Sequence, residues 1–174
     1  MRHGDAVKPV ITYAERTLTE KGKFEASAAR VFLRMAGEIP DVVMHSAQSR
    51  SKMTAQCVAI SIGTSNPEGI LVNRDDMEED SPPEEFLASA VSDFGRTNKT
   101  KTILAVGHMP FVQRLASLLL ASRPTLMDDF SKGDLLAFSS IGGGRAWTLR
   151  FYMTSKQIKD FYRLYLDMVA STGA

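Results

Sequence analysis

Short apolar runs alternate along the chain with longer segments of helical periodicity, which predicts strands and helices in alternation. The clearest run is Thr102–Val106, which is rich in β-branched and apolar residues, as expected of a parallel strand buried on both faces. The full set of predicted strands is 42–44, 69–72, 102–106, 134–140 and 146–151, the last two forming a hairpin around Gly142 to Gly144.

Apolar residues spaced three and four positions apart predict amphipathic helices between these strands. Thr19 is a suitable N-cap for the first helix, and Ser81 followed by Pro82 suits the start of the third. The fourth predicted helix covers 111–122 and the last about 155–170. The predicted inward positions are Phe24, Ala28, Val31, Phe32 and Met35 in the first helix, Phe86, Leu87, Ala90, Val91 and Phe94 in the third, and Ile158, Phe161, Tyr162, Tyr165 and Val169 in the last. The second helix carries Arg50, Met53, Cys57 and Ile60, with Cys57 on its apolar side.

This order of elements predicts an α/β fold, a three-layer sandwich with a mostly parallel central sheet flanked by helices. The 174 residues suit one domain, 1–174, and the 44% hydrophobic and 24% charged composition is that of a globular chain. Repeats, linkers and low-complexity segments are not visible in the sequence.

Charge and cysteine content exclude several classes of function. A formal net charge of +1 gives no global attraction to nucleic acid or to an anionic membrane, so any anion site must be local. No apolar run approaches the roughly 20 residues of a membrane span, and no signal peptide is recognisable. The single cysteine, Cys57, excludes an internal disulfide, so we expect a cytoplasmic protein. From the charge balance and the lack of a membrane span we expect no nucleic-acid or membrane partner.

Candidate chemistry gathers at three strand ends. Arg2-His3-Gly4 opens the chain, Arg50 lies just past the strand 42–44, and His108 follows the strand that ends at Val106. The carboxyl ends of parallel strands meet at one edge of a sheet, so these side chains are expected to surround one anion, with phosphate as the natural guest. Almost nothing precedes His3, so the strand that should carry it either begins upstream or is reduced to Met1.

With these motifs in order, the sequence resembles the histidine phosphatase superfamily, in the branch that includes phosphoglycerate mutase. Its short length and Arg16 before Leu18-Thr19 are most similar to the small bacterial phosphohistidine phosphatases. The motifs that carry the resemblance are Arg2-His3-Gly4-Asp5-Ala6, Leu18-Thr19 with Gly22, Ser46 through Arg50 to Thr54-Ala55-Gln56, and Gly107-His108-Met109-Pro110.

The resemblance implies a phosphatase with a phosphoglycerate mutase-like fold and a covalent phosphohistidine intermediate. His3 would be the nucleophile, Arg2, Arg50 and His108 would hold the phosphoryl oxygens, and His108 would act in its protonated form. Gly4 and Arg16 are the candidates for further substrate contacts. No cofactor or metal is expected, because two arginines and a histidine supply the positive charge and the three histidines match no zinc-ligand spacing.

The expected substrate is phosphohistidine on a signalling protein, because the sequence shows no match for the carboxylic acid that would protonate an ester oxygen. Asp75, Asp76, Glu78 and Glu79 lie in the right region, but a solvated loop explains them better. Two alternatives stay open: a hydrolase of small phosphate esters, and a phospho-ligand binding module without turnover. Ala47 after Ser46 also departs from the family, which usually has proline there.

Overall fold

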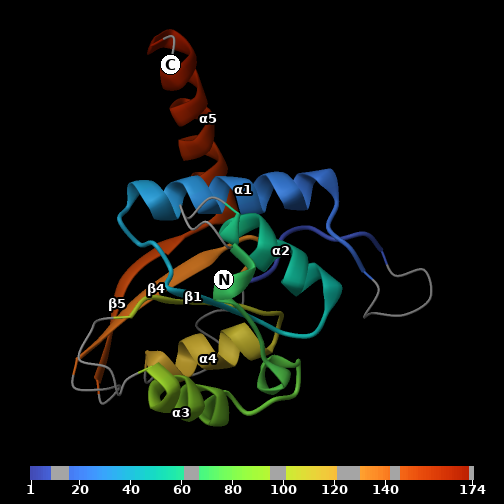
Figure 1. Cartoon of the computed structure of the whole chain (residues 1–174), viewed down its shortest axis with the longest axis vertical. Coiled ribbons are helices and arrows are strands. Elements are labelled where there is room, and N and C mark those ends of the chain that lie inside the picture. The colour runs from blue at the N-terminus through green and yellow to red at the C-terminus, as the bar shows by residue number, and fades with distance from the viewer. Residues whose placement is uncertain (9–15, 61–66, 95–100, 121–129, 142–145, 173–174) are drawn as a thin grey trace.

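The computed structural model describes residues 1–8, 16–60, 67–94, 101–120, 130–141 and 146–172. The predicted α/β class is confirmed (Figure 1). In chain order the elements are α1 (Glu20–Met35), β1 (Val42–His45), α2 (Ser49–Ala59), the 3-10 turn η1 (Pro67–Ile70), β2 (Leu71–Asn73), the 3-10 turn η2 (Asp75–Met77), α3 (Pro83–Phe94), β3 (Ile103–Val106), α4 (Phe111–Leu119), β4 (Leu135–Ile141), β5 (Ala146–Met153) and α5 (Ser155–Thr172).

Three strands form a parallel sheet in the order β2-β1-β3, and β4 and β5 form an antiparallel pair. The first residues of the chain lie between the two. Arg2 makes a parallel bridge with Gly107, the His3 N–H donates to the Gly107 carbonyl at 3.0 Å, and the Arg2 N–H donates to the Asp134 carbonyl at 3.1 Å. The strand expected to carry His3 is thus reduced to one bridge. This bridge and its neighbouring hydrogen bonds hold the backbone of His3 in place.

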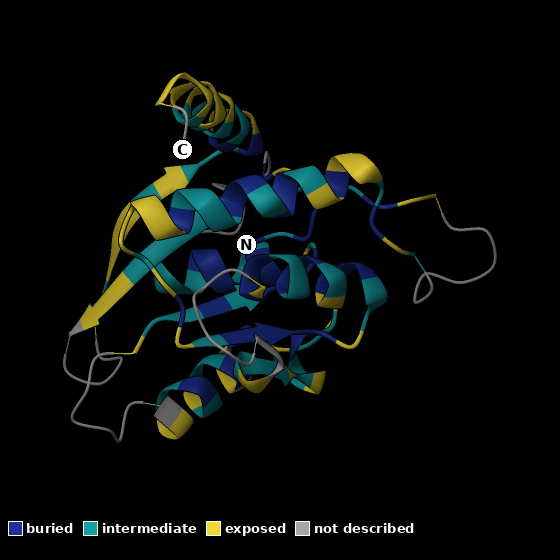
Figure 2. Cartoon of the chain, turned by 45° about the horizontal axis from the view of Figure 1, so that its top comes forward, coloured by how far each residue is buried: buried dark blue, intermediate teal, exposed yellow. Residues whose placement is uncertain are grey.

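Helices cover both faces of this sheet: α1, α2 and α5 lie on one side and α3 and α4 on the other, with the most buried residues between them (Figures 1 and 2). Strand alternation divides the core accordingly. In β1, Val43 packs with α1 and α2 residues, whereas Met44 packs with α3 and α4 around Phe111. The three-layer arrangement therefore follows from strands that are apolar on both faces. No helix in the described ranges is long and apolar enough to span a membrane.

Several predicted helix faces are wrong in detail. Met35 is exposed in α1, and Ile60 lies just past α2 and is 62% exposed. Cys57, predicted as core, is only half-buried. Most of the residues that these two helices do bury are small or polar, as follows: Gly22, Glu25, Ala26, Ala28, Ala29 and Leu33 in α1, and Arg50, Ser51, Thr54, Ala55, Val58 and Ala59 in α2. Apolar periodicity misses such faces because small residues let neighbouring elements pack closely and polar residues form hydrogen bonds, and neither kind counts as strongly apolar.

Helix ends also shift slightly. Thr19 caps α1 as predicted, accepting from the Gly22 N–H at 3.1 Å. Helix α3 begins at Pro83, one residue later than expected, and the Ser81 hydroxyl accepts instead from the Glu78 N–H at 3.1 Å. Helix α4 ends at Leu119, and the predicted turn at Gly142 to Gly144 lies outside the described residues.

Helix α5 meets the body only through its first turns and then projects away from it (Figure 1). Ile158 is buried, whereas Phe161, Tyr162, Tyr165 and Val169, predicted as a buried side, are only half-buried. Leu164 is 69% exposed. The amphipathic pattern correctly predicts the helix but overstates how much of it the body covers.

The contrast within α5 gives a direct test of this packing. Ile158→Ala should lower the free energy of unfolding by about 2 to 5 kcal/mol, because it leaves a cavity in the core. Leu164→Ala, on the same helix, should change it by less than about 0.5 kcal/mol. Urea denaturation of both variants measures the difference, and equal losses would mean that the outer half of α5 is also packed.

Candidate active site

The carboxyl ends of the parallel strands place the predicted residues at one edge of the sheet. His3 follows the bridge to Gly107, His108 follows β3, and Arg50 lies in the first turn of α2, after β1. The His3 and His108 rings are 6.0 Å apart between centroids, and the Arg50 Nε lies 3.0 Å from His3 Nε2. Three of the four predicted catalytic residues are therefore in direct proximity.

Hydrogen bonds fix which tautomer His3 adopts. Its Nδ1 lies 2.7 Å from the Gly4 carbonyl oxygen, which can only accept, so Nδ1 carries the proton. Its Nε2 faces the Nε–H of Arg50, which can only donate, so Nε2 holds the lone pair. The ring is thus a neutral imidazole with Nε2 as its nucleophilic atom.

The surroundings keep His3 neutral. Burial lowers its pKa to about 3, and the positive charges of Arg50 and Arg2 act in the same direction, against the hydrogen bond to Gly4. The side chain is 4% exposed. His3 is therefore unprotonated at any pH near neutrality, as a nucleophile must be.

The two arginines bring positive charge to this neutral ring. Arg50 is buried, donates to His3 and pairs with Glu79, whose Oε1 lies 3.1 Å from its Nη2. Arg2 donates from Nη1 to the Phe130 carbonyl at 2.8 Å, and burial lowers its pKa despite the opposing charge of Asp134. Within the described part of the chain, Arg2 Nε has no hydrogen-bond partner and can still donate to an anion.

His108 is buried with both ring nitrogens unbonded among the described residues. Its Nε2 points at Glu78, 3.5 Å from Oε2. Burial and then the charge of Arg50 lower its pKa, while Glu78 and Glu79 oppose this. In the empty site these effects favour the neutral ring of His108, and its protonated form with a phosphoryl group bound stays a prediction. A bound phosphoryl dianion would favour its protonation.

Glu78 and Glu79 are the site residues that sequence reasoning did not place. Their loop follows β2, whose end lies at the same sheet edge, and this is the signal that could have found them. Both Glu78 oxygens accept hydrogen bonds, Oε1 from the Ala47 N–H at 3.2 Å and Oε2 from Gln48 Nε2 at 2.8 Å. With Asp80, Ser81 and Gln48 they line an open pocket of about 560 Å³.

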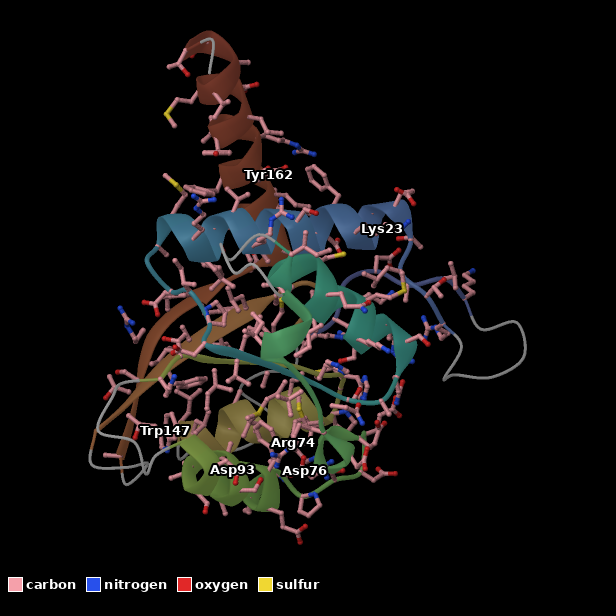
Figure 3. The ribbon with its side chains drawn as sticks, viewed as in Figure 1. Lys23, Arg74, Asp76, Asp93, Trp147 and Tyr162 are labelled. Atoms are coloured by element: carbon pink, nitrogen blue, oxygen red, sulfur yellow. The ribbon has the colours of Figure 1, made fainter. Side chains whose placement is uncertain are left out.

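Two arginines hold this acidic loop in position. Arg114 of α4 donates to the carbonyls of Glu79 and Ser81. Arg74 at the start of the loop pairs with Asp76 at 2.6 Å and with Asp93 of α3 at 3.3 Å, as Figure 3 shows beside α3. The loop is therefore attached to both helices on that side of the sheet.

Gly4 and Arg16, the expected substrate contacts, are explained first by packing. A Cβ on Gly4 would lie 2.6 Å from the Gly22 carbonyl oxygen, so glycine lets the loop cross the first turn of α1. The Gly4 N–H donates to Thr54 Oγ1 at 3.1 Å, and Arg16 Nε donates to the Val7 carbonyl at 2.8 Å. A contact of either residue with substrate stays a prediction.

The site suits an oxyanion better than a metal. No group of three or more histidine, cysteine or acidic side chains is placed to hold a metal ion in the described ranges. Arg2, Arg50 and His108 all lie close enough for their charges to act on His3, and Arg2 and His108 have nitrogens without a hydrogen-bond partner in the described ranges. Such donors match phosphoryl oxygens in charge and in hydrogen-bonding geometry.

The tautomer and low pKa of His3 can be checked directly. Its imidazole signals should show no titration between pH 8 and about pH 4 in NMR spectra of the folded protein, because its pKa is lowered by burial. Since the unfolded chain binds the proton first, this residue should also reduce stability as pH falls from 6.5 toward 3. Titration of His3 near pH 6.5 would contradict the assignment.

Comparison with known proteins identifies the fold. No family model matches the chain, and no curated protein matches it at a significant level. The protein histidine phosphatase SixA complexed with tungstate matches with TM-score 0.77 and 19% identity over 91% of this chain and 96% of that one.

Two further solved structures agree. A protein described as a phosphohistidine phosphatase SixA from Nakamurella multipartitia matches with TM-score 0.66 and 23% identity, over 88% of this chain and 92% of that one. Phosphoserine phosphatase from Entamoeba histolytica, bound to 3-phosphoglyceric acid, matches with TM-score 0.64 and 15% identity, over 90% of this chain and 95% of that one. The resemblance expected from the motifs is confirmed at the level of the fold, and the chain has the fold of the histidine phosphatases.

Proposed function

We propose that this protein is a phosphatase that works through a covalent phosphohistidine on His3 and acts on phosphohistidine substrates. The observation that carries the proposal is the neutral, oriented imidazole of His3, with its Nε2 lone pair facing Arg50 at 3.0 Å. The confirmed fold and the tungstate bound in the SixA structure support it.

In the first step the Nε2 lone pair of His3 attacks phosphorus, and the bond from phosphorus to the substrate nitrogen breaks. The departing imidazole keeps that electron pair and takes a proton from water. Arg50 turns from Nε2 to a phosphoryl oxygen, while Arg2 and His108 hold the others. These three donors together stabilise the charge of the transition state. Water then attacks the phosphohistidine, releasing phosphate and restoring His3.

Phosphohistidine is favoured because the two nearest carboxyl groups are engaged as carboxylates. Both oxygens of Glu78 accept hydrogen bonds, and Glu79 forms an ion pair with Arg50. As placed, neither holds a proton to give to a leaving alkoxide. A departing imidazole needs much less assistance, so a phosphoramidate suits this site.

A hydrolase of small phosphate esters is the second candidate. The 3.5 Å separation of Glu78 Oε2 from His108 Nε2 puts a carboxyl group at the mouth of the phosphoryl site. If substrate binding broke its bonds to Ala47 and Gln48, Glu78 could take up a proton and serve as the general acid. The third candidate is a module that binds phosphorylated ligands without turnover, and such a module would hydrolyse neither class of substrate.

Substitution of the histidines tests the covalent mechanism. His3→Ala should abolish turnover of phosphoimidazole, because the atom that forms the bond is gone. His108→Ala should lower kcat by about 100- to 1000-fold, the usual cost of one charge-stabilising donor. His45→Asn is the matched control, since this buried histidine bonds to the Ser46 carbonyl and should leave turnover intact. Similar mild losses in the first two variants would refute covalent catalysis.

Substrate choice separates the candidate functions. The ratio of kcat/KM for phosphoimidazole over p-nitrophenyl and glycerol phosphates should strongly favour the phosphoramidate. Glu78→Gln should change phosphoimidazole turnover by less than about tenfold, because that leaving group needs no acid. If esters are the better substrates and Glu78→Gln removes their hydrolysis, the second candidate is correct.

A further inference from the structure

Charge around the site is arranged in two zones of opposite sign. The inner zone beside His3 holds Arg2 and Arg50. The outer zone is the rim of the pocket of about 560 Å³, where Glu78, Glu79 and Asp80 line the wall. A substrate that enters through this pocket with its phosphoryl group inward would leave the rest of itself against three carboxylates.

The present partners of two of these carboxylates are the donors that a phosphoryl group would need. Glu79 pairs with Arg50 at 3.1 Å, and Glu78 faces His108 at 3.5 Å. His108 is 2% exposed and its ring nitrogens have no hydrogen bond within the described segments, so it can still donate to a ligand. Once Arg50 turns to phosphate, Glu79 loses its positive neighbour, while Glu78 keeps its hydrogen bonds to Ala47 and Gln48.

The remaining charges near the rim do not replace those partners. Asp80 is exposed and forms no ion pair with any residue of the described ranges. The Arg114 guanidinium is bound to the carbonyls of Glu79 and Ser81, and Lys132 pairs with Asp5 at 2.8 Å. Because no cation of the described ranges pairs with Asp80, a cationic side chain of the substrate can take that place.

We propose that this rim selects phosphohistidine in a peptide segment that carries lysine or arginine next to it, and disfavours segments with acidic neighbours. The inference rests on the proposed phosphatase activity and adds the substrate class. Residues one or two positions from the phosphohistidine lie within about 7 Å of it along an extended chain, which places their side chains at the rim.

Partly screened charges 5 to 7 Å apart interact by an energy that corresponds to about three- to tenfold in an equilibrium. A lysine beside the phosphohistidine should therefore raise kcat/KM by about that factor relative to alanine, and glutamate should lower it by a similar factor. The combined range between lysine and glutamate is about 10- to 100-fold.

The experiment uses three synthetic phosphohistidine peptides that differ only in having Lys, Ala or Glu on both sides of the modified residue. With the wild-type protein, kcat/KM should fall in the order Lys, Ala, Glu, and the differences should shrink in high salt. Asp80→Asn should reduce the Lys/Glu ratio by about three- to tenfold, and Asp80→Lys should reduce it further. Glu84→Gln, on the exposed first turn of α3, is the control that should leave the ratio unchanged.

Phosphoimidazole, which has no neighbouring charge, distinguishes the two levels of proposal. If it is hydrolysed but the three peptides react equally, or the Glu peptide reacts fastest, rim selection is wrong while the phosphatase proposal stands. If neither phosphoimidazole nor any peptide is hydrolysed, both proposals fail. If the Asp80→Asn variant has the same Lys/Glu ratio of kcat/KM as the wild-type protein, the role given to the rim is also wrong.

Discussion

The hydrogen bond from Arg50 Nε to His3 Nε2 is the interaction on which the site depends. It requires that a guanidinium be buried beside an imidazole, which is costly unless the imidazole stays neutral and the arginine is paired. The structure meets both conditions, since the Gly4 carbonyl accepts the hydrogen bond from His3 Nδ1 and Glu79 pairs with Arg50. The same arrangement leaves a lone pair beside a positive group, as phosphoryl transfer needs.

The scaffold serves mainly to hold these groups at one sheet edge. The few backbone bonds of residues 1–3 to Gly107 and Asp134 join the parallel sheet to the hairpin, and they place His3 between β3 and β4. Gly4 and Gly22 allow the loop after His3 to cross α1 closely. Core packing on both faces then makes the strand ends rigid, so the functional side chains are positioned before a ligand arrives.

Elements with simple periodicity could be predicted from the sequence, and so could the proximity of His3, Arg50 and His108. Contacts that depend on tertiary context could not. The buried side of α2 carries Arg50 and Thr54, which hydropathy treats as exposed, and the protonation of His108 depends on burial that no motif records. Glu78 reaches the site because Ser81, Gln48 and Ala47 bind it, although its sequence reads as a solvated loop.

The covalent role of His3 is tested most directly by trapping the intermediate. Rapid acid-free denaturation during turnover of ³²P-labelled phosphoimidazole, followed by peptide mapping and ³¹P NMR, should show one phosphoryl group on Nε2 of His3, because Nδ1 is bonded to Gly4. The label should be absent from His3→Ala and from denatured protein given the same reagent. Label on another residue, on Nδ1, or turnover without any labelled intermediate would contradict the account.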